Sequence, residues 1–468
     1  MVLRIVGEHD VIVAGGGPAG VVAAIASARN GSDTLLVERY GFLGGAITGQ
    51  FVTTLNSFLD MQGRQIVGGI PQEVIDRLQK LGGTLGHLQD NLWWSTGSIT
   101  LVDPALMKHV LLETALEAGV KLLLHTHVQD VVMDGDTIKG VVVANKGGAQ
   151  AILGRLVVDS TGDGDVASSA GAPYVRGRGD GSMQHVSLML RMGNVDQEKI
   201  LAYVRENPGQ FIIGENPYGR RSVEETIAQL HDIYQAPAMA GFFKLVEEAV
   251  ERGDMHPFSP RGGLCLQMTP RRGEMGVYAT NVANVDSTDA WNLTRAEIEL
   301  RRQALITVQF LKKYVPGFES AHLIDVAPQV GVRETRRIIG EYVLTEEDVL
   351  EGRKFPDVIA KGSHPADIHS PDDPKKVIHL HVKDGGSYDI PYRCLVPKKV
   401  DNLLVAGRCA SATHEAMGSA RVVGTCMAMG QAAGTAAALC ATYRVVPRWL
   451  DVEKLQKRLV EQGAVLHN

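Results

Sequence analysis

Three glycines near the N-terminus stand at a spacing that can hold the diphosphate of a dinucleotide. They are Gly15, Gly17 and Gly20, and they separate the apolar run 11–14 from an alanine-rich stretch of helical character. Gly15 permits a tight turn, Gly17 lets the backbone approach the diphosphate, and Gly20 lets the following helix pack closely. The phosphates would then lie at the N-terminus of that helix. A glycine-rich turn that serves packing alone is the alternative.

The acidic residue that follows favours the dinucleotide. Glu38 ends the apolar run 34–38, so residues 9–38 form one predicted strand–helix–strand unit. Its carboxylate can accept hydrogen bonds from the ribose hydroxyls of an adenosine and would repel a 2′-phosphate. We therefore predict that the turn, including Pro18 and Ala19, binds an adenine dinucleotide.

A second glycine-rich loop comes directly after Glu38, where an NAD enzyme normally continues into helix. At this loop, residues 39–46, the sequence resembles the glutathione-reductase-like superfamily of FAD proteins, whose corresponding loop wraps the diphosphate and the flavin. The resemblance implies FAD as the cofactor. The loop residues that it assigns to FAD binding are Arg39, Gly44, Gly45 and Ala46.

Further matches extend this resemblance over most of the chain. Residues 159–165 are similar to the second FAD motif of the superfamily, and residues 402–408 are similar to the third. The helix that starts at about Arg421 would then face the flavin, where its N-terminal dipole stabilises negative charge on the reduced ring. The positions that these matches imply for FAD binding are Val128, Thr161, Gly162, Asp163, Gly407, Arg408, Arg421, Val422 and Val423.

Four segments resemble, more closely, one family of bacterial proteins, the FAD-dependent oxidoreductases. They are residues 44–45, 331–337, 390–393 and 406–434. Membership would imply a Rossmann-type fold, FAD and a redox reaction, but it names no substrate.

The carboxylates of residues 159–165 raise the question of a metal site. A calcium-binding EF-hand loop needs ligands spread over about twelve residues and a closing glutamate, and this segment has neither. We predict no metal site.

His414 is the first candidate for catalysis, because it stands between the third FAD motif and the flavin-facing helix. Chain connectivity predicts that it lies near the isoalloxazine ring. The layout is similar to that of fumarate reductase and succinate dehydrogenase, but residues 416–418 read Ala-Met-Gly where an Asn-Arg-Leu-Gly signature is expected. His414 is therefore either a group that transfers protons or a structural hydrogen-bonding residue.

Arg333 and His369 are the other catalytic candidates. Arg333 could clamp a substrate carboxylate or carbonyl through paired hydrogen bonds, or it could belong to an ion-pair cluster with Glu334 and Glu341. His369 follows Asp367 by two residues. These two could act as a base and the carboxylate that orients it, or they could be polar groups of a loop.

Cysteine spacing and charge restrict the remaining possibilities. The five cysteines form no CxxC pair, which disfavours a disulfide framework, a zinc site and a dithiol redox centre, and favours a reducing cytoplasm. Cys409 and Cys426 are expected to be inert buried thiols, while covalent attachment of FAD stays open. The net charge of −6, without a run of five like charges, indicates neither a nucleic-acid nor a membrane surface. No run of eighteen apolar residues occurs.

The order of the predicted elements gives an α/β fold. We expect a Rossmann-type FAD-binding domain, made of a parallel sheet and a β-meander, from residues 1–170 and 400–445. Between these parts, residues 171–399 are expected to form an inserted α+β substrate domain. Residues 446–468 are expected to contain a C-terminal surface helix.

No second GxGxxG motif follows a later strand, so a built-in NAD(P)H domain is not expected. Electrons must then come from the substrate itself or from a separate donor. We predict an enzyme that moves a hydride between a small organic substrate and flavin N5, as a dehydrogenase or reductase. The alternatives are a flavin monooxygenase and an electron-transfer subunit of a larger complex. A homo-oligomer or an electron-transfer partner also stays open.

Overall fold

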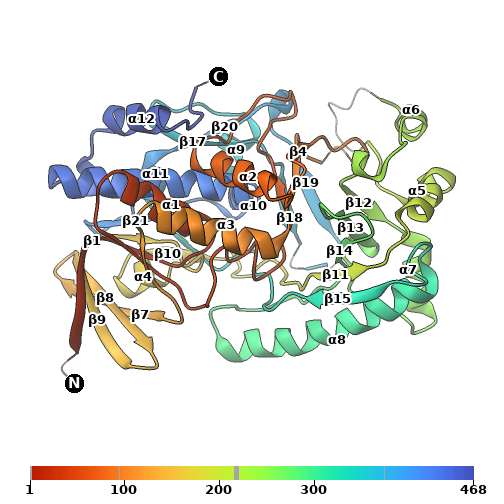
Figure 1. Ribbon diagram of the computed structural model, residues 1–468, viewed down its shortest axis with the longest axis horizontal. Helices are drawn as coiled ribbons and strands as arrows, with labels where there is room; N and C mark the ends of the chain where they lie inside the picture. Colours follow the sequence, from red (N-terminus) through yellow and green to blue (C-terminus); the bar gives the residue numbers. More distant parts are fainter. Residues whose placement is uncertain (1–2, 94, 215–220, 371, 374, 468) are drawn as a thin grey trace.

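The computed structural model describes residues 3–93, 95–214, 221–370, 372–373 and 375–467. Its elements form two groups that lie side by side (Figure 1). One group surrounds a large sheet and contains both ends of the chain, and the other surrounds an antiparallel sheet from the middle of the sequence. The predicted α/β fold is confirmed.

The large sheet is parallel where the glycine turn leaves it and antiparallel at its other end. Its parallel strands lie in the order β6-β2-β1-β9-β21, and the first half of β9 continues into a meander with β8 and β7. Residues 11–14 are fully buried, as expected for a strand covered on both faces. The strands are β1 (Arg4–Ala14), β2 (Thr34–Val37), β6 (Lys121–Leu123), β7 (His127–Asp134), β8 (Thr137–Asn145), β9 (Gly148–Asp159) and β21 (Leu403–Val405).

Two apolar helices pack against each other on one face of this sheet. They are α1 (Pro18–Arg29), which follows the glycine turn, and α11 (Val423–Tyr443), which follows the third motif. Both helices are buried over most of their length, so their apolar composition reflects packing in the core. The other helices of this group are α2 (Ile70–Lys80), α3 (Pro104–Glu117), α4 (Asp165–Ser169), α9 (Glu346–Leu350), α10 (His414–Ala420) and α12 (Val452–Glu461).

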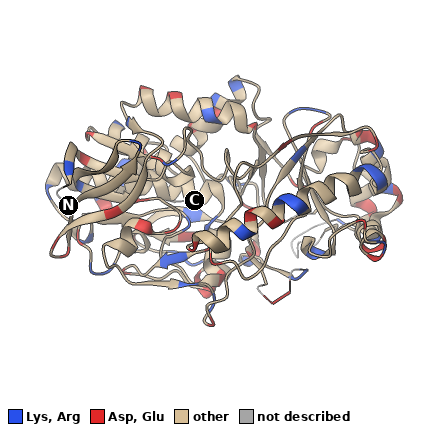
Figure 2. Ribbon diagram, turned by 90° about the horizontal axis from the view of Figure 1, so that it is seen from below, with Lys and Arg blue, Asp and Glu red and all other residues tan. Residues whose placement is uncertain are grey.

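The second group is an antiparallel sheet with strand order β12-β13-β14-β11-β15. Its side chains form a separate apolar core with those of the neighbouring helices. The longest helix, α8, runs along this group and carries both basic and acidic side chains (Figure 2). The elements are β11 (Leu190–Gly193), β12 (Ala238–Gly241), β13 (Leu264–Met268), β14 (Met275–Tyr278), β15 (His322–Val326), α5 (Gln197–Glu206), α6 (Val223–Ala228), α7 (Phe243–Glu251) and α8 (Ala290–Tyr314).

Short strands form further small sheets. The pair β18 (Ala366–His369) and β19 (Val377–Leu380) is antiparallel and places Asp367 directly opposite His379. Residues 358–360 and 388–396 pack in the same apolar core as α1 and α11. The remaining strands are β3 (Thr54–Asn56), β4 (His87–Leu88), β5 (Ile99–Leu101), β10 (Tyr174–Arg176), β16 (Arg336–Ile338), β17 (Val358–Gly362) and β20 (Tyr388–Pro391).

The C-terminal helix has a buried apolar stripe. Leu455 and Leu459 of α12 are buried and Val452 is partly buried. Within the described part of the chain, no single helix is long and apolar enough to cross a membrane. By length and composition, α10 and α11 qualify only together, as a pair bent by 91°.

His256 gives the fold a sensitivity to acid. It is buried and contacts Thr307 of α8 through Nε2, and burial lowers its pKa from 6.5 to about 4. Between these pH values the unfolded chain binds a proton that the folded chain does not, so acid destabilises the fold. When the pH falls from 7 to 4, the wild type should therefore lose up to about 3 kcal/mol more unfolding free energy than His256→Gln. Urea unfolding at several pH values measures this difference.

The control is His109→Gln, because the side chain of His109 is exposed on α3. This variant should keep the acid sensitivity of the wild type. If His256→Gln keeps it as well, the buried neutral imidazole is not its source.

Candidate active site

The glycine turn joins β1 to α1 and leaves open space at its centre. Gly15 has a φ of 94°, and a Cβ on Gly20 would lie 1.8 Å from the carbonyl oxygen of Gly15. By contrast, apart from Gly17 and its chain neighbours, no atom of the described residues lies within 4 Å of the place that a Cβ on Gly17 would take. No side chain caps the N-terminus of α1, so its first amides are free to bind an anion there. The turn therefore fits a diphosphate that approaches Gly17.

Glu38 ties the two glycine-rich loops together. Its carboxylate accepts hydrogen bonds from the backbone amides of Gly16 (2.6 Å) and Tyr40 (2.9 Å), and the amide of Gly44 donates to the carbonyl oxygen of Gly16 (2.8 Å). Glu38 also lines the cavity beside the turn. Its remaining lone pairs are therefore placed where an adenosine ribose would lie.

The second motif is held by hydrogen bonds within its own loop. Buried Asp159 accepts bonds from the amides of Thr161 (3.0 Å) and Ala167 (2.9 Å). Asp163 pairs with Arg408 at 2.6 Å, which fixes the second motif to the third. Ser160 lines the same cavity, and its buried hydroxyl has no hydrogen-bond partner among the described residues.

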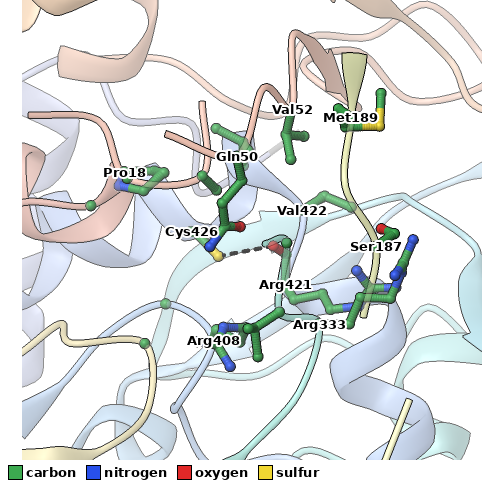
Figure 3. A pocket seen from close by; sticks show the side chains of 18 of the residues that line it. Pro18, Gln50, Val52, Ser187, Met189, Arg333, Arg408, Arg421, Val422 and Cys426 are labelled. Carbon is green, nitrogen blue, oxygen red and sulfur yellow. Dashed lines mark hydrogen bonds between the residues drawn. The ribbon is translucent and has the colours of Figure 1, made fainter. Parts of the chain in front are cut away.

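The N-terminus of α11 borders the same cavity. Val422 and Val423 line the wall, and no side chain caps this end of the helix. Figure 3 shows Pro18 at one end of the cavity, Arg333 at the other, and Gln50 and Arg421 between them. A flat ring system bound here would face the positive end of the α11 dipole.

Most of the predicted FAD-binding residues line this one cavity. Three do not: Gly20 packs α1 against the turn, Gly44 bonds to the first loop, and Asp163 holds Arg408. The predicted residues that line it are Gly15, Gly17, Pro18, Ala19, Glu38, Arg39, Gly45, Ala46, Val128, Thr161, Gly162, Gly407, Arg408, Arg421, Val422 and Val423.

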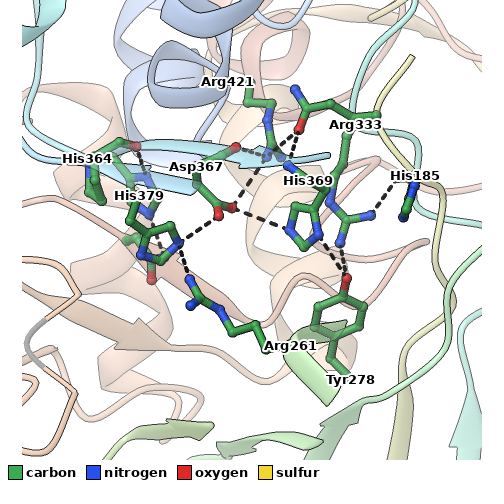
Figure 4. A network of polar contacts seen from close by, with 12 residues as sticks. His185, Arg261, Tyr278, Arg333, His364, Asp367, His369, His379 and Arg421 are labelled. Carbon is green, nitrogen blue, oxygen red and sulfur yellow. Dashed lines mark hydrogen bonds and ion pairs between the residues drawn. The ribbon is translucent and has the colours of Figure 1, made fainter. Parts of the chain in front are cut away.

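A cluster of polar side chains forms the far wall of the same cavity, and Asp367 is at its centre (Figure 4). One carboxylate oxygen of Asp367 lies 2.7 Å from Nε2 of His379, and the other lies 3.6 Å from Nε2 of His369. Asp367 and His369 are two residues apart on β18, so they share a face, and His379 is directly opposite Asp367 on β19. Arg421 approaches the same carboxylate at 3.5 Å.

Arg333 and Tyr278 extend this cluster. The Arg333 guanidinium donates to the Tyr278 hydroxyl (2.8 Å) and to the carbonyl oxygen of His185 (2.7 Å). The Tyr278 hydroxyl also lies 3.5 Å from Nδ1 of His369. The structure thus brings two of the predicted catalytic residues, Arg333 and His369, to one tyrosine.

Within the described part of the chain, Arg333 does not join the ion-pair cluster that the sequence offered as an alternative. Glu334 pairs with Arg337, and Glu341 pairs with Arg448 at 2.8 Å. The partners that the structure gives Arg333 are therefore neutral, and its charge faces the cavity.

Burial sets the protonation states of the far wall. Burial and the charge of Arg333 lower the pKa of His369 to about 3, so its imidazole is neutral near pH 7. Burial alone would raise the pKa of Asp367, but His369 and His379 hold it well below its usual value. Burial raises the pKa of Tyr278 to about 12, so the phenol keeps its proton. The wall therefore offers a neutral base beside an ionised carboxylate.

His414 is not among the described residues that line this cavity. It is the first residue of α10, and its Nδ1 lies 2.8 Å from Glu334. Its side chain borders a separate hollow together with Thr413 and Arg337. The expectation that chain connectivity keeps His414 near the ring is therefore not met, because α10 begins there and directs the imidazole toward Glu334.

Several residues of the far wall have no sequence signal. Neither Tyr278 nor His379 belongs to a motif. The pairing of β19 with β18 brings His379 to Asp367, and a side-chain contact between β14 and β18 brings Tyr278 to His369. The pairing of β18 with β19 could have indicated His379, because cross-strand neighbours share a face. Cys426 lines the cavity, and burial raises its pKa to about 12, as expected of an inert thiol.

Comparison with known protein families shows which family this chain belongs to. The family described as FAD dependent oxidoreductase matches residues 10–459. The chain belongs to this family. The protein is therefore an FAD-dependent oxidoreductase, and the open turn at Gly17, Glu38 and the uncapped end of α11 fit its cofactor.

The oxidoreductase matches individual relatives over only part of their length. It is 24% identical over 158 residues to digeranylgeranylglycerophospholipid reductase 1 of Methanococcoides burtonii. The aligned region covers 33% of this chain and 38% of that protein. It is 30% identical over 173 residues to thiamine thiazole synthase of Methanococcus vannielii. That alignment covers 35% of this chain and 59% of that protein. The chain thus spans less than two thirds of these relatives.

A solved structure covers the oxidoreductase more completely. A geranylgeranyl bacteriochlorophyll reductase-like protein from Thermoplasma acidophilum aligns with 98% of this chain and 84% of its own length. The TM-score is 0.47 and the sequence identity is 13%.

Glu38 provides a direct test of the adenosine end of the site. We expect Glu38→Gln to weaken FAD binding about tenfold or more, because hydrogen bonds to a charged group contribute ~1.5–3 kcal/mol. Calorimetric titration of the apoprotein with FAD measures the change. Glu117→Gln on the exposed side of α3 is the matched control and should bind FAD like the wild type. Equal affinity of both variants would contradict the role given to Glu38.

Proposed function

We propose that this oxidoreductase moves a hydride between a small organic substrate and FAD, as a dehydrogenase or reductase. The observation that carries the proposal is that Arg333, Tyr278, His369 and Asp367 form one wall of the cavity whose other wall is the glycine turn. When bound, FAD supplies a hydride acceptor or donor at flavin N5. We assign the substrate-facing part of the protein to residues 171–399.

Different side chains of the far wall bind the substrate and transfer its proton. Arg333 orients the substrate, since the groups that its guanidinium bonds among the described residues are neutral. In the oxidative direction, the substrate loses a hydride from carbon and a proton from the attached oxygen or nitrogen. Nδ1 of His369 accepts that proton, either directly or through the Tyr278 hydroxyl. Asp367 stabilises the resulting imidazolium at Nε2.

Anaerobic mixing tests this function. FAD-loaded protein is mixed with a panel of small hydroxy acids, amino acids, alcohols and unsaturated acids, and the oxidised flavin band is followed. For reductase activity, the flavin is first reduced chemically and its reoxidation by each unsaturated compound is followed. We expect at least one compound to change the redox state of the flavin within the turnover time. Oxygen consumption coupled to NAD(P)H, with no anaerobic reaction, would instead indicate a monooxygenase and contradict the proposal.

The buried base predicts an unusual pH profile. Because the pKa of His369 is lowered to about 3, kcat/KM for oxidation should stay level from about pH 8 to about pH 4 and should not fall near 6.5. Arg333→Gln removes a charge that lowers this pKa, so the acid limb should move to higher pH. The exposed Arg302→Gln on α8 is the control and should keep the wild-type profile. A wild-type fall centred near 6.5 would contradict a buried neutral His369.

A further inference from the structure

The far wall of the cavity is positively charged at one end. Its described charged residues are Arg261, Arg333 and Arg421, against the single carboxylate of Asp367. Asp367 is already in contact with Arg421 and two histidines, and the Nε of Arg421 is buried without a partner. One carboxylate does not balance three guanidinium groups, so an anionic ligand would lower the electrostatic cost of placing them together at this wall.

At the other end of this wall, uncharged side chains form a row, and Gln267 and Phe243 lie beside it. In the antiparallel sheet, Tyr278 of β14 is opposite Cys265 of β13, and Cys265 is opposite Ala240 of β12. All three line the cavity, so they form one row on the same face. Neighbouring strands are ~4.8 Å apart, so the row extends about 10 Å from the tyrosine. Ala238 also lines this part, and Leu264 borders its end.

We propose that the substrate is an organic anion with an apolar body. Its charged group binds beside Arg333, and its body lies along the row from Cys265 to Ala240. Tyr278 belongs both to the row and to the contacts of Arg333, so the reacting carbon is next to the anionic group and near His369. The inference rests on the proposed function only in placing the reaction at this wall.

Ligand binding tests this substrate class without turnover. FAD-loaded protein is titrated with acetate, octanoate and 1-octanol, and perturbation of the flavin absorbance bands is recorded beside calorimetry. We expect octanoate to bind at least about tenfold more tightly than acetate, because each buried methylene is worth about fourfold in affinity. We also expect octanoate to bind at least about tenfold more tightly than 1-octanol, because the alcohol offers Arg333 no charge.

Two variants locate the two ends of the ligand. Arg333→Gln should weaken octanoate binding at least about tenfold, whereas Arg302→Gln on the outside of α8 should not change it. Ala240→Phe should fill the row and remove the preference for octanoate over acetate. Far-ultraviolet circular dichroism and FAD content show that each variant is folded and loaded.

Each outcome decides one part of the proposal. Equal binding of acetate and octanoate would rule out the apolar body, and equal binding of octanoate and 1-octanol would rule out the anionic group. Octanoate binding without any substrate that reacts with the flavin would overturn the proposed function but not this inference. A neutral or cationic substrate that reacts with the flavin, in a protein that binds no carboxylate, would overturn this inference alone.

Discussion

Gly17→Ala should give a protein that folds normally but purifies without flavin. Gly17 has a φ of −68° and a ψ of −175°, which alanine adopts readily. Beyond its chain neighbours, no atom in the described part of the chain lies within 4 Å of the new Cβ. The methyl group would instead occupy the space through which the backbone approaches the diphosphate. We expect FAD affinity to fall at least ~100-fold, or about 3 kcal/mol. The unfolding free energy of the apoprotein should change by less than about 1 kcal/mol.

Gly20→Ala is the matched control, because it adds the same methyl group one helical turn away. Its Cβ would lie 1.8 Å from the carbonyl oxygen of Gly15, so the turn must move. We expect this variant to lose about 3 kcal/mol or more of unfolding free energy. Absorbance of the purified proteins and urea unfolding separate the two effects. If Gly17→Ala retained wild-type FAD affinity, the turn would not be the diphosphate site.

His369→Gln should retain FAD and lose most of its activity. The substituted side chain keeps a polar group near Tyr278 and Asp367 but cannot take a proton. General-base catalysis contributes typically ~10²–10⁴-fold, so the rate of anaerobic flavin reduction should fall by that factor. Stopped-flow absorbance measures this rate, and the flavin-to-protein ratio shows that the cofactor is still bound.

His414→Gln separates the proposed base from the histidine that connectivity favours. Its imidazole contacts Glu334 and lies outside the lining of the cavity. This variant should reduce flavin at close to the wild-type rate, and its main effect should be on stability, because Glu334 is buried and loses a partner. A slow His414→Gln together with a normal His369→Gln would reverse the two assignments.

The cofactor side of the site could be predicted from sequence because its signals are local. The glycines at 15, 17 and 20, the acid at 38 and the later FAD motifs each act within a short segment whose elements follow from apolar runs. The strand, turn and helix that they require then form in the predicted places. The loop contact of Gly44 and the pairing of Asp163 with Arg408 required coordinates.

The substrate side could be predicted only in part, because strand pairing assembles it. Arg333 and His369 could be selected as chemically suitable residues, but their meeting at Tyr278 depends on segments about 35 to 90 residues apart. His414 shows the opposite case. It is close to the third motif in the chain, yet the direction in which α10 begins takes its side chain away from the cavity. Closeness in sequence therefore predicted where the backbone of His414 lies, but not the direction of its imidazole.

A crystal structure of the FAD-loaded protein tests the central claim most directly. We expect density for the diphosphate at Gly17 and for the isoalloxazine between the N-terminus of α11 and the wall that contains Arg333 and His369. Density for the ring in any other part of the molecule, or on the far side of Glu334 beside His414, would contradict the account.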